Sequence, residues 1–414
     1  MKINMTRYSH NAVGIWTILV CYILVLIGVV TILQVLIGKE TLSPSILVHF
    51  DASHYQGIML YGYGQESSAF FPLFPYSWRA LGVGPLGISL FNTALFLFAL
   101  STLISVLSIH WRTVLIWLTL PTVFFLMLPY TEAWFFIGAS GVIVGVRRKQ
   151  LAFTLLGLFA CTVARPAFTA LLPALIFATA LGHESLKRKL FEITTVVSTC
   201  LVGLATVVAI QYHDTGDIFA FYTAQSGYGN SLKFPSFPLT SWGGGSIVRL
   251  DATALLIGIL SGGVLLWSMI RRWKNKPDQI GQEVVLSVTY LFVVSGIALM
   301  LRGGELYSLN RFIFATPFSL VLIHEYFEHR VRLPVKNVVV IFFGLLIYFL
   351  FFGSFVHIQT FGKFAVLSAF LSIYLIYPNM LLNRRSWVFP WILLASFIIQ
   401  VYYLLHYLGD EWVA

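Results

Sequence analysis

Long apolar stretches follow one another along almost the whole chain, separated by short polar connections. A helix crosses a bilayer in roughly 20 residues, so stretches of this length predict membrane-spanning helices. The connection at Arg165-Pro166 is short enough to be a kinked or re-entrant turn, which leaves the helix count open between residues 150 and 181. The pattern predicts about thirteen spans, at residues 13–37, 86–109, 113–128, 132–146, 151–164, 167–181, 190–211, 250–270, 284–301, 312–325, 337–356, 364–381 and 388–406.

The composition agrees with this pattern. Of the 414 residues, 58% are hydrophobic and only 10% are charged, whereas a soluble domain carries about 25% charged residues. We therefore expect an all-α polytopic membrane protein in which residues 1–414 form a single integral membrane domain. The first apolar stretch is longer than the roughly 7–15-residue core of a signal peptide, so we expect it to be retained as a helix. No internal repeat is visible in the sequence. Because many transporters are built from repeated halves, this argues against a transporter of that kind.

Basic residues predict the orientation of the chain. Its net charge is +10, which cationic cytoplasmic loops explain without a nucleic-acid partner. With a cytoplasmic N-terminus, 18 of the 26 lysines and arginines lie in inner loops, and ten of the 16 acids lie in outer ones. Topology does not explain the outer bases, so they are candidates for function: Lys39, Arg79, Arg165, Lys233, Arg249, Arg302, Arg311 and Lys363.

The first outer loop, residues 38–85, carries the main candidate for catalysis. Asp51, His54 and Tyr55 have the i, i+3, i+4 spacing of one helix face, and Gly62 is expected to end that short interfacial helix. A carboxylate placed there could take a proton from an attacking hydroxyl as a general base. The alternative is that Asp51 only caps the helix.

A Phe-Phe-Pro-Leu-Phe-Pro stretch follows at residues 70–75. Its two prolines are expected to prevent a regular helix. This stretch could dip into the bilayer and line a groove for an acyl chain, or it could belong to the aromatic belt at the membrane interface.

Two further outer connections carry charges between apolar spans. Glu132 follows Pro129-Tyr130-Thr131 and could orient sugar hydroxyls or an arginine, or it could simply favour the start of a helix. Arg165 lies where an unpaired charge is expensive, and its guanidinium could hold a phosphate through a bidentate contact.

The second long outer loop, residues 212–249, contains Gln225, Trp242 and a run of three glycines. It could be a lid with aromatic rings suited to sugar faces, or an unstructured connector. The last outer patch contains Arg302, Asn310 and Arg311. Its arginines could neutralise a phosphate, or Arg302 could pair with Glu305.

Metal and cysteine chemistry have little support in the sequence. His49 and His54 flank Asp51, but no second cluster of ligands matches them, so we expect neither a metal nor another cofactor. The three cysteines, Cys21, Cys161 and Cys200, lie in apolar spans without disulfide or metal spacing.

Several motifs, in this order and all in outer loops, resemble the PIG-V-like branch of the GT-C glycosyltransferases. Residues 49–55 resemble the Arg-Trp-Asp motif of that family, with a Tyr four residues later, although His49 and Phe50 replace the usual Arg and Trp. Residues 69–75 resemble its Phe-Phe-Pro-Leu-aromatic-Pro signature, and residues 129–133 its Pro-aromatic-Ser-Glu turn. Arg165-Pro166, residues 221–242 and residues 308–312 resemble an Arg-Pro pair, a loop with Gln and Trp, and a late Arg-Tyr motif.

The resemblance implies the GT-C fold and a glycosyltransferase that inverts the anomeric centre while moving a sugar, expected to be mannose, from a polyprenyl-phosphate donor. Asp51 would be the catalytic base or would orient the acceptor, which could be a glycan, a lipid or a protein. Arg165, Arg302 and Arg311 would hold the donor phosphate, and His54, Tyr55, Glu132, Gln225, Trp242 and Asn310 would line the substrate site.

The implied reaction takes place at the outer face of a membrane, which for a prokaryotic chain is the cytoplasmic membrane. Short loops favour a prokaryotic relative. Two other functions stay open from the sequence: a transporter or flippase of a lipid-linked saccharide, and a non-catalytic membrane scaffold. A transporter would need ionisable groups near the membrane midplane, whereas the charges of this chain lie at the ends of the predicted helices.

Overall fold

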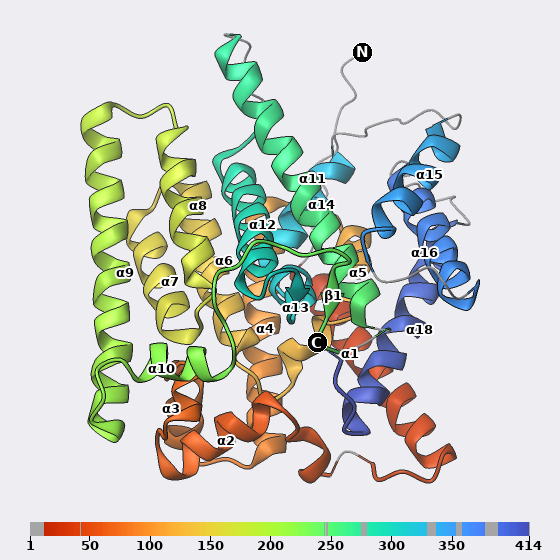
Figure 1. Cartoon of the computed structure of the whole chain (residues 1–414), viewed down its shortest axis with the longest axis horizontal. Coiled ribbons are helices and arrows are strands. Elements are labelled where there is room, and N and C mark those ends of the chain that lie inside the picture. Colours follow the sequence, from red (N-terminus) through yellow and green to blue (C-terminus); the bar gives the residue numbers. More distant parts are fainter. Residues whose placement is uncertain are drawn as a thin grey trace.

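The computed structural model describes residues 12–41, 43–243, 245, 247–274, 280–328, 337–352, 358–376 and 388–413. These residues form a predominantly helical protein (Figure 1). The α-helices are α1 (Ala12–Leu36), α2 (Asp51–Tyr61), α3 (Leu73–Leu81), α4 (Pro85–Leu107), α5 (Trp111–Leu118), α6 (Glu132–Arg148), α7 (Leu151–Ala164), α8 (Phe168–Ala180), α9 (Leu186–Thr215), α10 (Ala220–Gly227), α11 (Ile247–Trp273), α12 (Gln282–Leu301), α13 (Leu309–Phe314), α14 (Pro317–Glu328), α15 (Asn337–Phe349), α16 (Ile358–Ile376) and α18 (Val388–Leu408). Three 3₁₀ helices, η1 (Ser45–Leu47), η2 (Glu66–Ala69) and η3 (Val123–Met127), and two short strands, β1 (Thr240–Ser241) and β2 (Glu305–Leu306), complete the fold.

Six of the described helices are long and apolar enough to cross a membrane. They are α1, α4, α9, α11, α12 and α18, and four shorter apolar helices accompany them: α7, α8, α15 and α16. Many of their large apolar side chains face outward, as expected where lipid is the solvent. The chain is therefore a multi-pass helical membrane protein, as its composition predicts.

Three of the connections that the charge pattern assigns to the inner side meet at one end of the molecule. Lys149, after α6, lies 2.8 Å from Glu184 in the connection between α8 and α9. Arg147 lies 3.0 Å from Glu283 at the start of α12. Since these ion pairs join three separate connections, the basic clusters form one surface. The inner arginines and lysines at residues 330–336 and 384–385 lie outside the described residues.

The opposite end gathers the outer loops. Asp214, near the end of α9, accepts hydrogen bonds from the Tyr63 amide at 3.0 Å and the Tyr76 hydroxyl at 2.9 Å. Gln211 donates to the Ser68 carbonyl at 2.8 Å. Figure 1 shows α2, α3 and α10 toward its lower edge and the connection between α8 and α9 at its upper edge. The two long outer loops therefore lie together, away from the basic surface.

Two expected spans are not continuous helices. Residues 113–128 divide into α5, which ends at Leu118, and η3, which begins at Val123. Residues 312–325 divide between α13 and α14 at Thr316. Each break lies at a proline, Pro121 or Pro317, and a proline removes a backbone donor and disfavours helical geometry in the residue before it. The expected spans 337–356 and 364–381 extend beyond the described parts of α15 and α16.

The first outer loop is more helical than its prolines suggest. The expectation that Pro72 and Pro75 prevent a regular helix is wrong, because α3 begins at Leu73. Both prolines lie at the start of α3, where the backbone amides have no partner within the helix in any case. Phe71 and Phe74 are fully buried in the protein, so they line neither an acyl groove nor an aromatic belt.

The second outer loop is ordered by its own elements. It contains α10, and β1 pairs in parallel with β2, with Thr240 opposite Glu305 and Ser241 opposite Leu306. The amides of Ser231 and Lys233 also donate to the carbonyls of Leu301 and Met300, at 3.0 and 2.8 Å. This loop is therefore not an unstructured connector. Gly244, the middle residue of the three glycines, lies outside the described residues.

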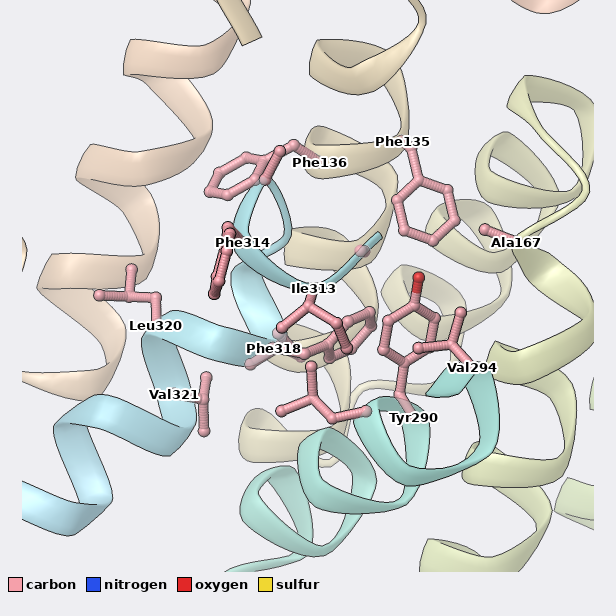
Figure 2. Packing of buried hydrophobic residues seen from close by; sticks show 14 of the residues in the cluster. Phe135, Phe136, Ala167, Tyr290, Val294, Ile313, Phe314, Phe318, Leu320 and Val321 are labelled. Carbon is pink, nitrogen blue, oxygen red and sulfur yellow. The ribbon is translucent and has the colours of Figure 1, made fainter. Parts of the chain in front are cut away.

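A layer of buried apolar side chains packs α6, α12, α13 and α14 against one another (Figure 2). Tyr290 of α12 packs against Phe318 of α14 with ring centroids 4.1 Å apart, and Phe135 of α6 lies 6.1 Å from Tyr290. Ile313 and Phe314 of α13 belong to the same layer. Because α13 is only six residues long, this packing, rather than helix propensity, holds it in place.

Candidate functional site

Four charged side chains from distant parts of the chain form one row. An Nη2 of Arg311 donates to Oδ2 of Asp51 at 2.7 Å, and its Nη1 lies 3.7 Å from Oε1 of Glu132. Arg165 donates to the same Oε1 at 3.2 Å. Arg311, Glu132 and Arg165 are almost fully buried, at 4%, 1% and 6% exposure. Asp51 keeps 16% of its side chain exposed, so it is the open end of the row.

Asp51 is the first residue of α2, and its carboxylate does not cap that helix. Phe50 precedes it with a φ of +53°, a conformation that costs a residue with a Cβ about 1–3 kcal/mol. This backbone directs the start of α2 toward α13. Oδ1 of Asp51 accepts no hydrogen bond from any side chain or amide in the described part of the chain, so it is available to a ligand.

Arg311 is held in place by its neighbour on α13. Asp251, fully buried near the start of α11, accepts from the amide of Asn310 at 2.9 Å and from its side-chain nitrogen at 2.8 Å. Ser241 of β1 donates to the other oxygen of Asp251 at 2.6 Å. Asn310 is therefore a structural clamp rather than an open substrate contact. Asp251 was missed as a site residue, because only the fold brings it to α13.

The surroundings of Arg311 keep it charged. Burial disfavours the guanidinium, but Asp51 and Glu132 outweigh that effect and raise the pKa of Arg311 above its ordinary value. The rings of Phe125 and Tyr130 lie 5.1 and 5.3 Å from its central carbon. These faces shield the ion pairs from water and strengthen them.

Glu132 and Arg165 form the deeply buried end of the row. Glu132 is the first residue of α6, so it also favours the start of that helix, but its Oε1 contacts both arginines. Its Oε2 is buried without a partner among the described residues. Arg165 lies 4.1 Å from the centre of the Phe312 ring, behind Glu132 when viewed from Asp51.

His54 and Tyr55 lie beside the row from α2. His54 stacks on Phe70 with centroids 4.9 Å apart, and it is partly exposed. Tyr55 is buried and packs edge-on against Phe70 and Phe74, each at 5.1 Å. Burial and the charges of Glu132 and Asp51 raise the pKa of Tyr55, so it stays a neutral phenol beside the ions.

Arg302 and Gln225 form a second group at the end of α12. Arg302 donates to the side chain of Asn230 and to the carbonyl of Tyr228, both at 2.7 Å, and lies 3.5 Å from Glu305. Asn230 in turn donates to Gln225 at 2.6 Å. The expected Arg302–Glu305 pair is therefore present, and Arg302 fastens the second outer loop to the end of α12.

Trp242 belongs to an aromatic group that reaches the ion pair. Its ring lies 5.7 Å from Tyr307 and 5.0 Å from Trp412, and Trp412 lies 6.0 Å from the central carbon of Arg311. Burial and the charge of Asp51 raise the pKa of Tyr307 to about 12, which keeps its hydroxyl a hydrogen-bond donor. No sequence motif indicates Trp412, since it follows the last apolar span.

Within the described residues, no three His, Cys, Asp or Glu side chains lie close enough to hold a metal ion. His49 pairs with Asp410 at 3.0 Å, and His54 stacks on Phe70. The histidines on either side of Asp51 are thus occupied by other contacts.

Comparisons with protein-family models, with curated proteins and with solved structures found no match to this chain.

Proposed function

We propose that this protein is a membrane glycosyltransferase with a GT-C-type fold of about thirteen spans. It transfers a sugar, expected to be mannose, from a polyprenyl-phosphate donor to an acceptor hydroxyl at the outer face of the membrane. The proposal joins the order of the sequence motifs with the grouping of their residues. Asp51, Tyr55, Glu132, Arg165 and Arg311 come from four different motifs and lie around a single row of ion pairs.

The single observation that carries this function is the contact between Asp51 and Arg311. One carboxylate oxygen is fixed by a buried guanidinium at 2.7 Å, and the other accepts no hydrogen bond within the described structure. A fixed, half-open carboxylate suits the orientation of an attacking hydroxyl. Because the guanidinium fixes one oxygen of Asp51 at 2.7 Å, the other oxygen has a set direction, so orientation of the acceptor is a large part of its role.

The chemistry needs one proton acceptor and one stabilised leaving group. The acceptor oxygen forms a bond to the anomeric carbon of the donor sugar, while the bond between that carbon and the phosphate oxygen breaks. The phosphate keeps the electron pair, and the acceptor proton passes to Oδ1 of Asp51. A phosphate leaving group needs no proton near neutral pH, so a single carboxylate is sufficient.

Charge balance bears on which cation meets the donor phosphate. Arg311 and Arg165 are matched by Asp51 and Glu132, and Arg302 lies 3.5 Å from Glu305. Arg311 remains the cation nearest to Asp51 and stabilises charge on the leaving phosphate. Arg165 supports Glu132 from behind, and Arg302 contributes from the end of α12.

Arg249 supplies a further positive charge. It lies two residues before Asp251 at the start of α11, and its side chain has no hydrogen bond or ion pair in the described structure, although its Nε is buried. A partly buried guanidinium without a partner favours an anion beside it. We therefore add Arg249 to the residues that hold the donor phosphate.

Apolar side chains of the second outer loop fit a lipid-linked donor. Leu232, Phe234 and Phe237 are 73%, 91% and 66% exposed, next to the end of α12, to which their loop is hydrogen-bonded. Large apolar side chains this exposed contact lipid in a membrane protein. On this proposal, the prenyl chain lies on the same side of the molecule as Arg302.

The test is transfer of radiolabelled mannose from polyprenyl-phosphate-mannose by purified protein in vesicles, with glycans, lipids and peptides as acceptors. Asp51→Asn should lower transfer by at least about a hundredfold, as loss of a general base does. Asp217→Asn, which changes an exposed acid outside the site, should leave it unchanged. Near-normal transfer by Asp51→Asn would remove Asp51 from its role, and no transfer of mannose, glucose or galactose by the unmodified protein would reject the function.

A further inference from the structure

The segment after α18 returns to the ion pair. The amides of Asp410 and Glu411 bond back to the carbonyls of Tyr407 and His406, at 3.1 and 3.0 Å. Asp410 pairs with His49 at 3.0 Å, only two residues before Asp51. Val413 is buried, with 2% exposure. These contacts fix the segment on both sides of Trp412, so the position of that ring is determined by the fold.

Trp412 joins three other rings into one cluster, which we call the aromatic platform: Phe50, Trp242, Tyr307 and Trp412. The Trp412 ring plane is nearly perpendicular to those of Phe50 and Trp242, at 90° and 81°, and is inclined by 36° to that of Tyr307. The Trp412 centroid lies 5.0 Å from Phe50, 5.0 Å from Trp242 and 5.6 Å from Tyr307. Trp242 is 53% exposed, and Tyr307 and Trp412 are partly exposed. The platform is therefore open on one side and does not form part of a closed core.

Charged groups border the platform. Arg311, which holds Asp51, lies 6.0 Å from the Trp412 ring, and Arg302 lies 4.4 Å from the Tyr307 ring. A pyranose has one face of C–H groups that packs on an aromatic ring, while its hydroxyls point sideways to carboxylates and guanidinium groups. The combination of open rings and flanking charges matches that chemistry better than it matches a purely apolar ligand.

Gly243 makes room for Trp412. A Cβ on Gly243 would lie 2.7 Å from Cδ1 of Trp412 and 2.6 Å from Cγ1 of Ile247, closer than side-chain atoms approach. Gly245, two residues later, has nothing within 4 Å of the same position. The pair provides a way to displace the Trp412 ring without altering Trp412 itself, together with its own matched control.

We propose that Trp412, with Trp242 and Tyr307, is the platform on which a pyranose ring lies beside Asp51. This inference rests on the proposed function and assigns a sugar contact to a segment that no motif indicated. The ring could belong to the donor or to the acceptor, since both present the same C–H face. Trp412 positions that sugar and takes no part in proton transfer.

Binding can be tested without turnover. The protein, labelled with 5-fluorotryptophan in lipid nanodiscs, is titrated with methyl mannoside, methyl glucoside and methyl galactoside while ¹⁹F resonances are followed. Trp412→Phe assigns the Trp412 signal. A saturable shift of that signal with at least one glycoside, absent with glycerol and absent at Trp391, which is 64% exposed on α18, supports the platform.

Kinetics distinguish the two sources of the sugar. Trp412→Ala and Gly243→Ala should raise the KM for the donor or for the acceptor by about tenfold, as expected for the loss of an aromatic contact, with little change in kcat. Gly245→Ala should stay near the unmodified protein, and Trp412→Phe, which keeps an aromatic face, should recover part of the loss. A raised donor KM in acceptor-free hydrolysis would show that the platform binds the donor sugar. A raised acceptor KM alone would show that it binds the acceptor sugar.

An unmoved Trp412 signal together with unchanged KM values would overturn the platform while leaving the transferase intact. An unmodified protein that neither transfers nor hydrolyses would reject the transferase. In that case the fluorine titration alone decides the platform.

Discussion

The guanidinium of Arg311 lies 2.7 Å from the carboxylate of Asp51, although 260 residues separate them in the chain. The pair joins α2 of the first outer loop to α13, beside the rings of Phe125 and Tyr130. A buried ion pair of this kind adds little net stability over an apolar pair, but breaking one partner is costly. The contact therefore fixes geometry more than it adds free energy.

Replacement of Arg311 should damage the fold as well as the activity. Arg311→Ala leaves Asp51 and Glu132 without their shared cation, and we expect a loss of about 3–5 kcal/mol of stability. Thermal unfolding in detergent, followed by tryptophan fluorescence, should show a clearly lower apparent Tm. Arg79→Ala serves as the control, because that arginine is exposed and, in the described part of the chain, pairs with no acid but donates to the carbonyls of Met59 and Ile58. Equal Tm values for the two variants would mean that the buried pairing of Arg311 is unimportant.

The sequence predicted the helical class and the positions of the long apolar helices, six of which in the described part of the chain could cross a membrane, because long apolar stretches are local signals. It also singled out the residues of the row, because charges at the ends of such stretches are local signals. It did not predict the breaks at residues 119–122 and 315–316. The signal was present in Pro121 and Pro317, but apolar runs that continue through a proline look like one span. Pro75 was misjudged for the opposite reason, since a proline is tolerated in the first turn of α3.

The sequence could not predict contacts between residues that lie far apart in the chain. Asp251 was counted only as an outer acid, yet it holds Asn310 through two hydrogen bonds. Trp412 reaches Phe50 and Trp242 only because the chain returns after α18. No local pattern encodes either contact. The same is true of Arg302, whose partners Tyr228 and Asn230 lie more than 70 residues away in the chain.

Gly62 should tolerate no side chain. It ends α2 with a φ of +85° and a ψ of −168°, a region that only glycine adopts readily, and a Cβ would lie 2.8 Å from Oδ2 of Asp214. Gly62→Ala should cost about 1–3 kcal/mol and lower the apparent Tm. Gly64→Ala is the matched control, with its nearest atom at 3.9 Å. If hydrogen exchange at residues 62–64 is as slow in Gly62→Ala as in the unmodified protein, the strain argument fails.

Arg249 should affect the donor more than the acceptor. Arg249→Gln removes a guanidinium that has no internal partner in the described structure, so the fold should keep its Tm. The donor KM should rise roughly tenfold or more, as expected for a lost charge-assisted contact with phosphate. Arg249→Lys should recover part of the loss, since lysine keeps the charge without the bidentate geometry. The measurement is donor-dependent hydrolysis without acceptor, and an unchanged donor KM would exclude Arg249 from the phosphate site.

The two ends of the molecule should face opposite sides of the membrane. Glu66→Cys and Lys187→Cys place a thiol at exposed positions near α2 and at the start of α9, in a background where Cys21, Cys161 and Cys200 are replaced by alanine. Because basic clusters stay in the cytoplasm, a membrane-impermeant maleimide should label residue 66 on intact cells and residue 187 only after permeabilisation. The reverse pattern would place Asp51 on the cytoplasmic side. A donor on the outer face would then be out of reach of the site, even with its geometry unchanged.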